Sequence, residues 1–509
     1  MQGGFVVLDF GSQFTQLIAR RLREIHVYSE ILPFNAPIEK IRELAPRGIF
    51  LSGGPNSVSE DGSPKRSIRE LSEIAPLFGI CYGMQLIAQD LGGVVEPSLK
   101  REYGFNQITW SQSISHELPD EQKVWMSHGD TVRVPPPGYK IIATSETGHP
   151  AAIRNDRVWA VQFHPEVSHT EFGTELIKAF CFDFCKAVPD WDPPHIASHL
   201  IERIKAQVGP IDHVLCGLSG GVDSSVVAAL LTKAIGVDRV HCVFVNNGLL
   251  RKDEYQEVLA KYRTIGLNVV GVNAEKSFLK GLEGLSDPEA KRKAIGHIFI
   301  EVFAKALEKL NIKSEWLAQG TLYPDVIESV SIRGQSVTIK SHHNVGGLPE
   351  KMKMKLVEPL RELFKDEVRL IGKELGLPSD IINRHPFPGP GLAIRIIGEI
   401  KKEDLDTLRE CDHIFISELR DAGLYDKIWQ AFAVLLPIRS VGVQGDGRTY
   451  EKVLAIRAVT SIDGMTADWY GFEPEFMRAL SNKITNEVKG VNRVVYDITS
   501  KPPGTIEWE

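Results

Sequence analysis

The sequence has few cysteines and no long hydrophobic run. Only six of its 509 residues are cysteine, which argues against a disulfide framework and is typical of a protein kept reduced. No run of 18 apolar residues occurs, and a strand-like segment follows the N-terminal methionine without a basic and apolar leader. We therefore expect a cytoplasmic protein with no membrane partner.

The chain also lacks an excess of positive charge, internal repeats and low-complexity tracts. Its formal net charge is -7, so composition gives no electrostatic reason to expect a nucleic acid partner. Cys181 and Cys185 lie close together in the sequence, but no further Cys/His cluster completes a zinc site, so we expect both in a helix core. With 43% hydrophobic and 25% charged residues, a chain of this length is expected to form about three globular domains.

Alternating strand-like and helix-like segments predict an α/β fold with two open, mostly parallel sheets. The first pattern covers residues 1–190, ends in a helix expected over 171–186, and is followed by a proline-rich linker. The second covers residues 195–384. Residues 385–509 begin with a Pro/Gly-rich run and indicate a small α+β domain, with helices expected over 403–422 and 474–488 and strands near 440–443, 453–459 and 493–497.

A Ser/Gly-rich loop lies between an expected strand at 214–218 and a helical pattern that begins at Val226. Its glycines let the backbone fold around an anion, and the helix N-terminus offers unpaired N–H groups. No Gly-Lys-Ser/Thr is present, which excludes the common nucleoside-triphosphate loop. A glycine turn that caps a helix is the alternative. The loop and helix start are Ser219, Gly220, Gly221, Val222, Asp223, Ser224 and Ser225.

These seven residues resemble the pyrophosphate loop of the ATP pyrophosphatases. The resemblance implies that they bind ATP, that the bond between the α and β phosphates is cleaved, and that the domain has the adenine-nucleotide α-hydrolase-like fold. Magnesium is expected with ATP, because the transferring phosphates need charge neutralisation. Asp223 is a candidate ligand or water-mediated partner of this ion.

A second chemical site is expected at Cys81, where a strand turns sharply into a helix in Phe78–Gln85. The helix start favours the thiolate, and neighbouring N–H groups can hold an oxyanion. A lone cysteine here would more often be a core residue. However, His164 and Glu166 follow another apolar strand and supply a base with a carboxylate to orient it.

These residues resemble the class I glutamine amidotransferases, which release ammonia from glutamine through a thioester. The resemblance covers the first segment and implies a catalytic triad of Cys81, His164 and Glu166. It also implies that the N–H groups of Gly54 and Tyr82 form the oxyanion hole. Gln85 and the stretch Ser127–Asp130 match positions that shape the glutamine pocket.

An ammonia source joined to an adenylating domain predicts amidotransfer, in which ammonia displaces AMP from an activated oxygen. The order of the two sites, followed by the segments 319–325, 384–391 and 501–509, resembles the GMP-forming amidotransferase family over the whole chain. That resemblance implies xanthosine monophosphate (XMP) as the acceptor and a homodimer formed through residues 385–509. It implies XMP contacts by Arg292, Gln430, Lys501 and Glu507.

Some patterns have simpler interpretations. By itself Arg292 is a helix-surface charge, and the C-terminal segment 501–509 is a frayed tail. The segment 340–355 has no clean period and is interpreted as a lid over the nucleotide or as a surface loop. Other functions to weigh are a glutamine-dependent NAD synthetase, a tRNA-thiolating pyrophosphatase and a regulatory protein that senses glutamine or nucleotides.

Overall fold

The computed structural model describes residues 3–111, 114, 118–310, 314–329, 354–444, 447–461 and 466–509. The chain divides into two compact units, residues 1–196 with 324–338, and residues 197–323 with 339–509. The segment 340–355, predicted to be a lid, lies outside the described residues apart from Met354 and Lys355. Within the described ranges, no helix combines the length and the apolar character that a membrane crossing needs.

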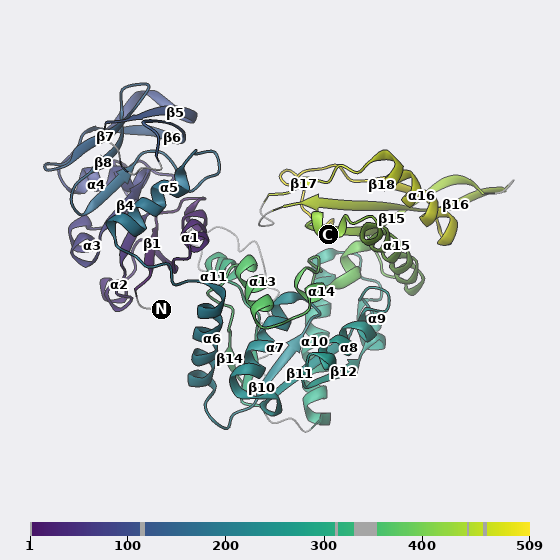
Figure 1. The fold of residues 1–509 in the computed structure, drawn as a ribbon. Helices are drawn as coiled ribbons and strands as arrows, with labels where there is room; N and C mark the ends of the chain where they lie inside the picture. Colours follow the sequence, from purple (N-terminus) through teal and green to yellow (C-terminus); the bar gives the residue numbers. More distant parts are fainter. Residues whose placement is uncertain are drawn as a thin grey trace. The chain divides into compact units, whose positions relative to one another are not determined.

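The first unit is built on a nine-stranded sheet of order β2-β1-β3-β4-β9-β8-β7-β5-β6. The half from β2 to β9 is parallel, and the half from β9 to β6 is antiparallel. The elements of residues 5–184, shown in purple to blue in Figure 1, are β1 (Phe5–Asp9), α1 (Thr15–Glu24), β2 (Ser29–Pro33), α2 (Ile38–Glu43), β3 (Gly48–Leu51), α3 (Ile68–Ile74), β4 (Leu77–Ile80), α4 (Tyr82–Asp90), β5 (Val94–Trp110), β6 (Glu121–Val134), β7 (Lys140–Ser145), β8 (Pro150–Arg154), β9 (Val158–Val161), α5 (Gly173–Lys178) and a π-helix (Ala179–Phe184).

The central parallel strands of this unit are buried because helices cover them. Strands β3, β4 and β9 are buried at every position, as expected where both faces of a sheet are packed. The closing helix predicted over 171–186 is instead the short α5 followed by the π-helix. Cys181 lies buried in that π-helix, whereas Cys185 follows it and is only partly buried.

The second unit begins with a five-stranded parallel sheet of order β12-β11-β10-β13-β14. Helices α7 and α8 pack on these strands (Figure 1). The elements of residues 193–395, of which residues 193–196 and 324–329 are assigned to the first unit, are α6 (Pro193–Val208), β10 (Val214–Leu218), α7 (Val222–Ile235), a 3₁₀ turn (Val237–Arg239), β11 (Val240–Asn246), α8 (Glu254–Thr264), β12 (Val269–Asn273), α9 (Glu275–Leu282), α10 (Pro288–Leu310), β13 (Trp316–Ala318), α11 (Tyr323–Ser329), β14 (Lys355–Val357), α13 (Lys365–Glu374), α14 (Ser379–Ile382) and a 3₁₀ turn (Gly391–Arg395).

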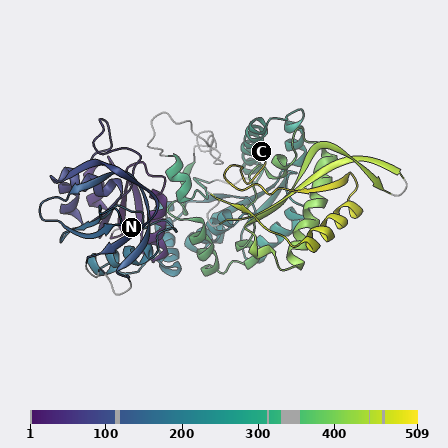
Figure 2. The ribbon, with the colours of Figure 1, turned by 90° about the horizontal axis from the view of Figure 1, so that it is seen from above.

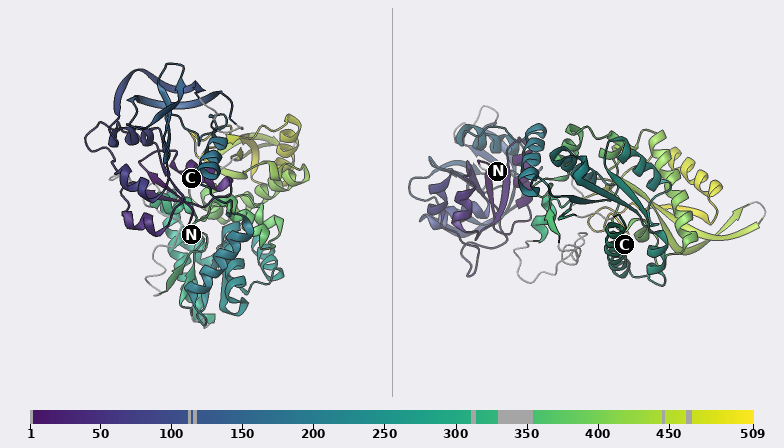
Figure 3. Two further views of the ribbon diagram at one scale, coloured as in Figure 1. Left: turned by 60° about the vertical axis from the view of Figure 1, so that its left-hand side comes forward. Right: turned by 90° about the horizontal axis from the view of Figure 1, so that it is seen from below.

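The C-terminal part of this unit is a four-stranded sheet on which α15 and α16 pack. Its strands β15 and β16 form a long antiparallel hairpin, and β18 runs parallel to β16. The hairpin projects past the two helices in Figure 2 and in the right-hand view of Figure 3. The elements are α15 (Lys402–Asp421), a 3₁₀ turn (Tyr425–Lys427), β15 (Gln430–Gln444), β16 (Gly447–Thr460), β17 (Asp468–Trp469), α16 (Pro474–Glu487) and β18 (Val491–Tyr496).

The predicted α/β class, with a C-terminal α+β part, is confirmed. The expected strand near 440–443 is only the distal end of β15, which begins at Gln430. Residues 431–435 are all buried, so this half of the strand lacks the alternation that identifies a strand in a sequence. The boundaries of the three predicted domains stay predictions.

Candidate active sites

Cys81 lies in a tight turn between β4 and α4. Its φ of 51° and ψ of -104° are strained for a residue with a side chain, as in a nucleophile elbow. Two glycines permit the turn, because a Cβ at Gly79 would lie 2.9 Å from the carbonyl carbon of Gly83, and one at Gly83 would lie 2.5 Å from the carbonyl oxygen of Leu51. The thiol is buried at the start of α4, within 3.7 Å of the Ser127 carbonyl oxygen.

His164 and Glu166 follow β9 and lie buried beside this turn. His164 Nδ1 donates a hydrogen bond of 2.8 Å to Glu166 Oε1, so Nε2 is the nitrogen left for the thiol. Burial opposes protonation of the imidazole, but the charge of Glu166 and hydrogen bonds with Cys81 and Glu166 outweigh it and raise the pKa of His164 to about 10. A protonated imidazole in this position can serve as the general acid for a leaving group.

The segment Leu51–Pro55 lies against both His164 and the start of α4. A Cβ at Gly53 would lie 3.1 Å from the imidazole carbon Cε1 of His164, and one at Gly54 would lie 3.2 Å from the ring of Tyr82. The backbone of Gly54 therefore comes close to the first residue of α4. The fold brings together all five residues that the sequence predicted for the triad and the oxyanion hole.

Gln85, predicted for the glutamine pocket, is tied to the stretch Ser127–Asp130. Its Nε2 donates to the carbonyl oxygen of Asp130 at 3.0 Å, and His128 Nδ1 donates to the same oxygen at 2.9 Å. The other imidazole nitrogen of His128 lies 2.9 Å from Glu102, a buried carboxylate that the sequence did not point out. Burial raises the pKa of Glu102, but hydrogen bonds from His128, Thr147 and Ser145 outweigh it and lower the pKa to about 2. The stretch Ser127–Asp130 is thus held both to Gln85 and to the buried carboxylate of Glu102.

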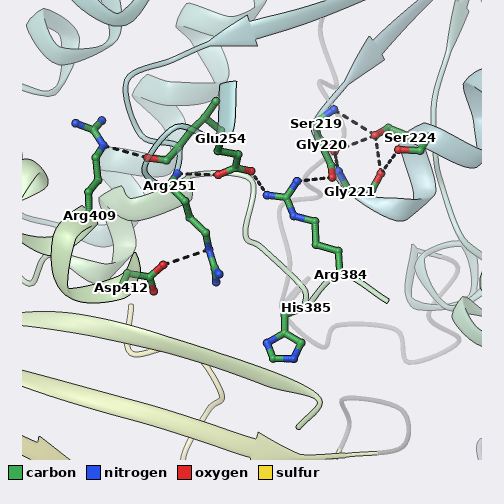
Figure 4. Close-up of polar contacts among 12 residues, drawn as sticks. Ser219, Gly220, Gly221, Ser224, Arg251, Glu254, Arg384, His385, Arg409 and Asp412 are labelled. Carbon is green, nitrogen blue, oxygen red and sulfur yellow. Dashed lines mark hydrogen bonds and ion pairs between the residues drawn. The ribbon is translucent and has the colours of Figure 1, made fainter. Parts of the chain in front are cut away.

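The Ser/Gly loop connects β10 to α7 in the second unit and folds on its own hydroxyl groups (Figure 4). The hydroxyl oxygens of Ser219 and Ser224 lie 3.1 Å apart, and that of Ser224 also accepts the Ser219 N–H at 3.2 Å. Gly220 has a φ of 80°, which favours glycine. The hydroxyl of Ser225 instead points into the protein and lies 2.9 Å from the hydroxyl of the buried Tyr262. This contact ties the first turn of α7 to α8.

Asp223 lies in the first turn of α7, and the two oxygens of its carboxylate have different surroundings. Its Oδ2 accepts a bond of 2.6 Å from Lys365 Nζ at the start of α13, a residue without a sequence signal. Its Oδ1 is buried and has no hydrogen-bond partner in the part of the chain that the structure describes. Such an oxygen suits a divalent cation that also binds phosphate oxygens.

The C-terminal segment is anchored rather than frayed, so the tail interpretation is wrong. Glu507 accepts from Gln430 Nε2 at 2.6 Å and from the fully buried Arg395 at 2.9 Å. Glu509 pairs with the buried Lys291 of α10 at 2.5 Å. The backbone of Lys501 exchanges hydrogen bonds with Ala467 at 2.7 and 3.1 Å.

Arg292 follows Lys291 on α10 and is ion-paired with Glu289 at 2.5 Å. The structure therefore brings Gln430 and Glu507 into direct contact. Arg292 is the neighbour in sequence of Lys291, which pairs with Glu509. Arg395 was missed, although an arginine inside the apolar run Leu392–Ile397 is a signal for a buried ion pair. Arg457 is also fully buried and donates to the carbonyl oxygens of Ile506 and Thr505. It too was missed, although it lies inside an apolar run.

Comparison with protein families supports the two kinds of site. Residues 6–184 match the class I glutamine amidotransferase family, residues 196–294 match NAD synthase, and residues 417–508 match the GMP synthase C-terminal domain. Together with the sites, these matches define a glutamine amidotransferase joined to an ATP pyrophosphatase of the NAD synthase kind.

Full-length relatives identify the particular family. The chain is 66% identical over 507 residues to the GMP synthase (glutamine-hydrolyzing) of Bdellovibrio bacteriovorus, with 99% of this chain and 100% of that protein covered. It is 55% identical to the enzyme of the same name from Cytophaga hutchinsonii and 54% identical to that from Chlorobaculum tepidum, with at least 98% of each chain covered. The chain belongs to the glutamine-hydrolysing GMP synthase family and is a ligase of glutamine-dependent GMP synthesis.

Proposed function

We propose that the chain converts XMP, ATP, glutamine and water into GMP, AMP, pyrophosphate and glutamate, with the residues assigned below. The observation that carries the proposal is that one chain holds both a buried Cys–His–Glu group and a Ser/Gly phosphate loop at a helix start. The first releases ammonia from an amide, and the second activates an oxygen for displacement. Only their combination gives amidation by glutamine.

In the first half-reaction the Cys81 thiolate attacks the carboxamide carbon of glutamine. The N–H groups of Gly54 and Tyr82 stabilise the oxyanion, and protonated His164 gives its proton to the departing ammonia. The resulting thioester is hydrolysed by water, whose proton returns to His164 as glutamate leaves. Glu166 keeps the imidazole oriented through the Nδ1 bond. Gln85 lines the glutamine pocket.

In the second half-reaction an XMP ring oxygen attacks the α-phosphorus of ATP, and pyrophosphate leaves. The loop Ser219–Ser224 and the start of α7 hold the phosphates by N–H groups and hydroxyls, with Lys365 as a further cation. Ammonia then attacks the activated ring carbon and displaces AMP. Mg²⁺, when bound with ATP, neutralises phosphate charge, and the unpartnered Oδ1 of Asp223 fits such an ion.

XMP is held by Arg292, Gln430, Lys501 and Glu507 in this proposal. The support is the fixed position of Glu507, whose carboxylate is gripped by Gln430 and by the buried Arg395. A carboxylate held in this way can accept hydrogen bonds from the ring N–H groups of XMP. The positive charges of Arg292 and Lys501 suit its phosphate. A cytoplasmic location stays a prediction.

An omission assay tests this function. With glutamine, Mg-ATP and XMP all present, we expect GMP and AMP to form in equal amounts while the xanthine absorbance falls. Omission of XMP or ATP should stop AMP and GMP formation, and ammonium should replace glutamine. If neither nitrogen source yields GMP, the proposed function is wrong.

We also propose that the protein forms a homodimer through residues 385–509. The distal hairpin of β15 and β16 exposes apolar side chains that a soluble monomer rarely keeps together. Ile438 is 56% exposed, Val441 52%, Val443 73% and Tyr450 56%. A second copy of the same hairpin is the partner of matching chemistry, because closed two-fold pairing covers both patches at once.

The double substitution Val441→Glu with Val443→Glu should convert the dimer to a monomer of 56.6 kDa. Both side chains are exposed, so the change adds charge to the patch without opening a cavity. Sedimentation velocity at micromolar concentration measures the mass. Ile211→Glu is the matched control, since Ile211 is 79% exposed on a different segment. A wild-type protein that sediments as a monomer would contradict the proposal.

A further inference from the structure

Arg384 and His385 are consecutive residues that reach two different sites of the second unit. Arg384 Nη1 donates a bond of 2.7 Å to the carbonyl oxygen of Gly220 in the Ser/Gly loop (Figure 4). His385 Nδ1 accepts a bond of 3.2 Å from the backbone N–H of Ala431. Ala431 follows Gln430, which holds Glu507. One dipeptide thus connects the ATP loop to the strand at the XMP site.

The contact of Arg384 holds the peptide unit between Gly220 and Gly221 in one orientation. Because a peptide unit is planar and trans, the carbonyl of Gly220 and the N–H of Gly221 point in opposite directions. The bond from Arg384 therefore turns the Gly221 N–H away from the guanidinium, toward Ser219 Oγ at 3.4 Å. The packing is close, since a Cβ at Gly220 would lie 2.9 Å from Arg384 Nη1.

Arg384 is itself held by Glu254, with which it forms an ion pair. Glu254 is buried, and its other oxygen accepts the backbone N–H of Arg251 at 2.7 Å. The Arg251 side chain continues to Asp412 at 3.4 Å and to the carbonyl oxygen of Ala431 at 3.3 Å. This second path ends at the same residue of β15 as the His385 contact.

His385 is held in one tautomer. Its Nε2 donates to the Tyr425 carbonyl oxygen at 2.9 Å, and its ring stacks on that of Tyr425 with centroids 3.8 Å apart. Burial lowers the pKa of His385 to about 4, and the charges of Arg251 and Arg420 act in the same direction. A neutral ring leaves Nδ1 free to accept the Ala431 N–H.

We propose that Arg384 is a positioning residue that couples XMP binding to the shape of the ATP loop, with His385 as the connection to β15. The coupling rests on the proposed role of Gln430 and Glu507 in holding XMP. When XMP fixes the start of β15, the dipeptide holds the Gly220 carbonyl, and the loop presents its N–H groups to the phosphates. By linkage, ATP tightens XMP binding by the same factor.

Calorimetric titration of the full-length protein tests the coupling. The titrant is an ATP analogue that cannot be cleaved between the α and β phosphates, with Mg²⁺, in the absence and presence of saturating XMP. We expect XMP to tighten analogue binding of the wild type by at least about fivefold. Arg384→Gln should reduce this factor to about one while XMP binding alone changes less than about twofold.

Two further variants sharpen the result. Arg384→Lys keeps the charge beside Glu254 but replaces the planar fork, which contacts Gly220 and Glu254 through two separate nitrogens, with a single nitrogen, so it should also weaken the coupling even if Arg384→Gln proves unstable. Lys252→Gln is the matched control, because Lys252 pairs with Glu410 at 2.7 Å near Arg251 but does not contact the loop. It should keep the wild-type factor.

The outcomes separate the coupling from the proposed function. A folded Arg384 variant with the wild-type factor, or a wild type without coupling, would overturn the role of Arg384 and leave GMP synthesis intact. An equal loss of XMP and analogue binding would make Arg384 a general structural residue and also overturn it. A wild type that binds no XMP would contradict the proposed function itself, and the coupling with it.

Discussion

Cys81→Ala is expected to lower the rate of GMP formation from glutamine by at least about 10⁴-fold and to leave the rate from ammonium unchanged. The thiol is the only group at the elbow that can form the thioester, and His164 beside it cannot replace a nucleophile. The second unit contains the whole loop and the anchored C-terminal segment, so adenylation does not need Cys81. GMP is measured with glutamine and, separately, with saturating ammonium.

Cys185→Ala is the matched control. Burial raises the pKa of this thiol to about 12, which makes it a poor nucleophile. It should keep both activities. Loss of the ammonium-dependent rate in Cys81→Ala would show that the division of labour between the two sites is mistaken.

Asp223→Asn is expected to lower GMP formation from both nitrogen sources by about 10²- to 10³-fold. The substitution removes the negative charge that pairs with Lys365 and that would face the phosphates in the proposed function, while the side chain keeps its size. The unpartnered Oδ1 loses its affinity for a cation, so the Mg²⁺ concentration for half-maximal rate should rise. Pyrophosphate release with ATP, XMP and ammonium is the measurement.

Asp238→Asn is the control for Asp223, because Asp238 is an exposed acid just beyond the other end of α7. It should behave as wild type. An Asp223→Asn variant with a rate within about twofold of wild type would remove Asp223 from the proposed site and with it the reason to place Mg²⁺ there.

Features that depend on neighbouring residues could be predicted from the sequence. The elbow at Cys81 and the loop at Gly220 each combine a buried strand, glycines and a helix start within a few positions, and the structure has both turns. The parallel strands β10, β11 and β13 of the second unit also follow from their buried apolar runs between helices, whereas β14, which is mostly exposed and begins at the end of the segment interpreted as a lid or loop, was not predicted. Local backbone geometry is decided by these residues themselves.

The irregular elements could not be predicted in this way. The π-helix at Ala179–Phe184 replaces the last turns of an expected α-helix, and its Phe180 packs against Phe50, Phe78 and Trp159, which are distant in the sequence. The first half of β15 was missed because burial of every side chain removes the period that marks a strand.

By itself the sequence determined the chemistry of each site: the nucleophile and its base, the phosphate loop, and the motifs that point to the acceptor. Only the tertiary structure decided which distant side chains complete the sites. Lys365 is 142 residues from Asp223, Arg384 is 164 from Gly220, and Arg395 is 112 from Glu507. A charge that folding buries needs a partner, and packing of whole elements, not local pattern, selects it.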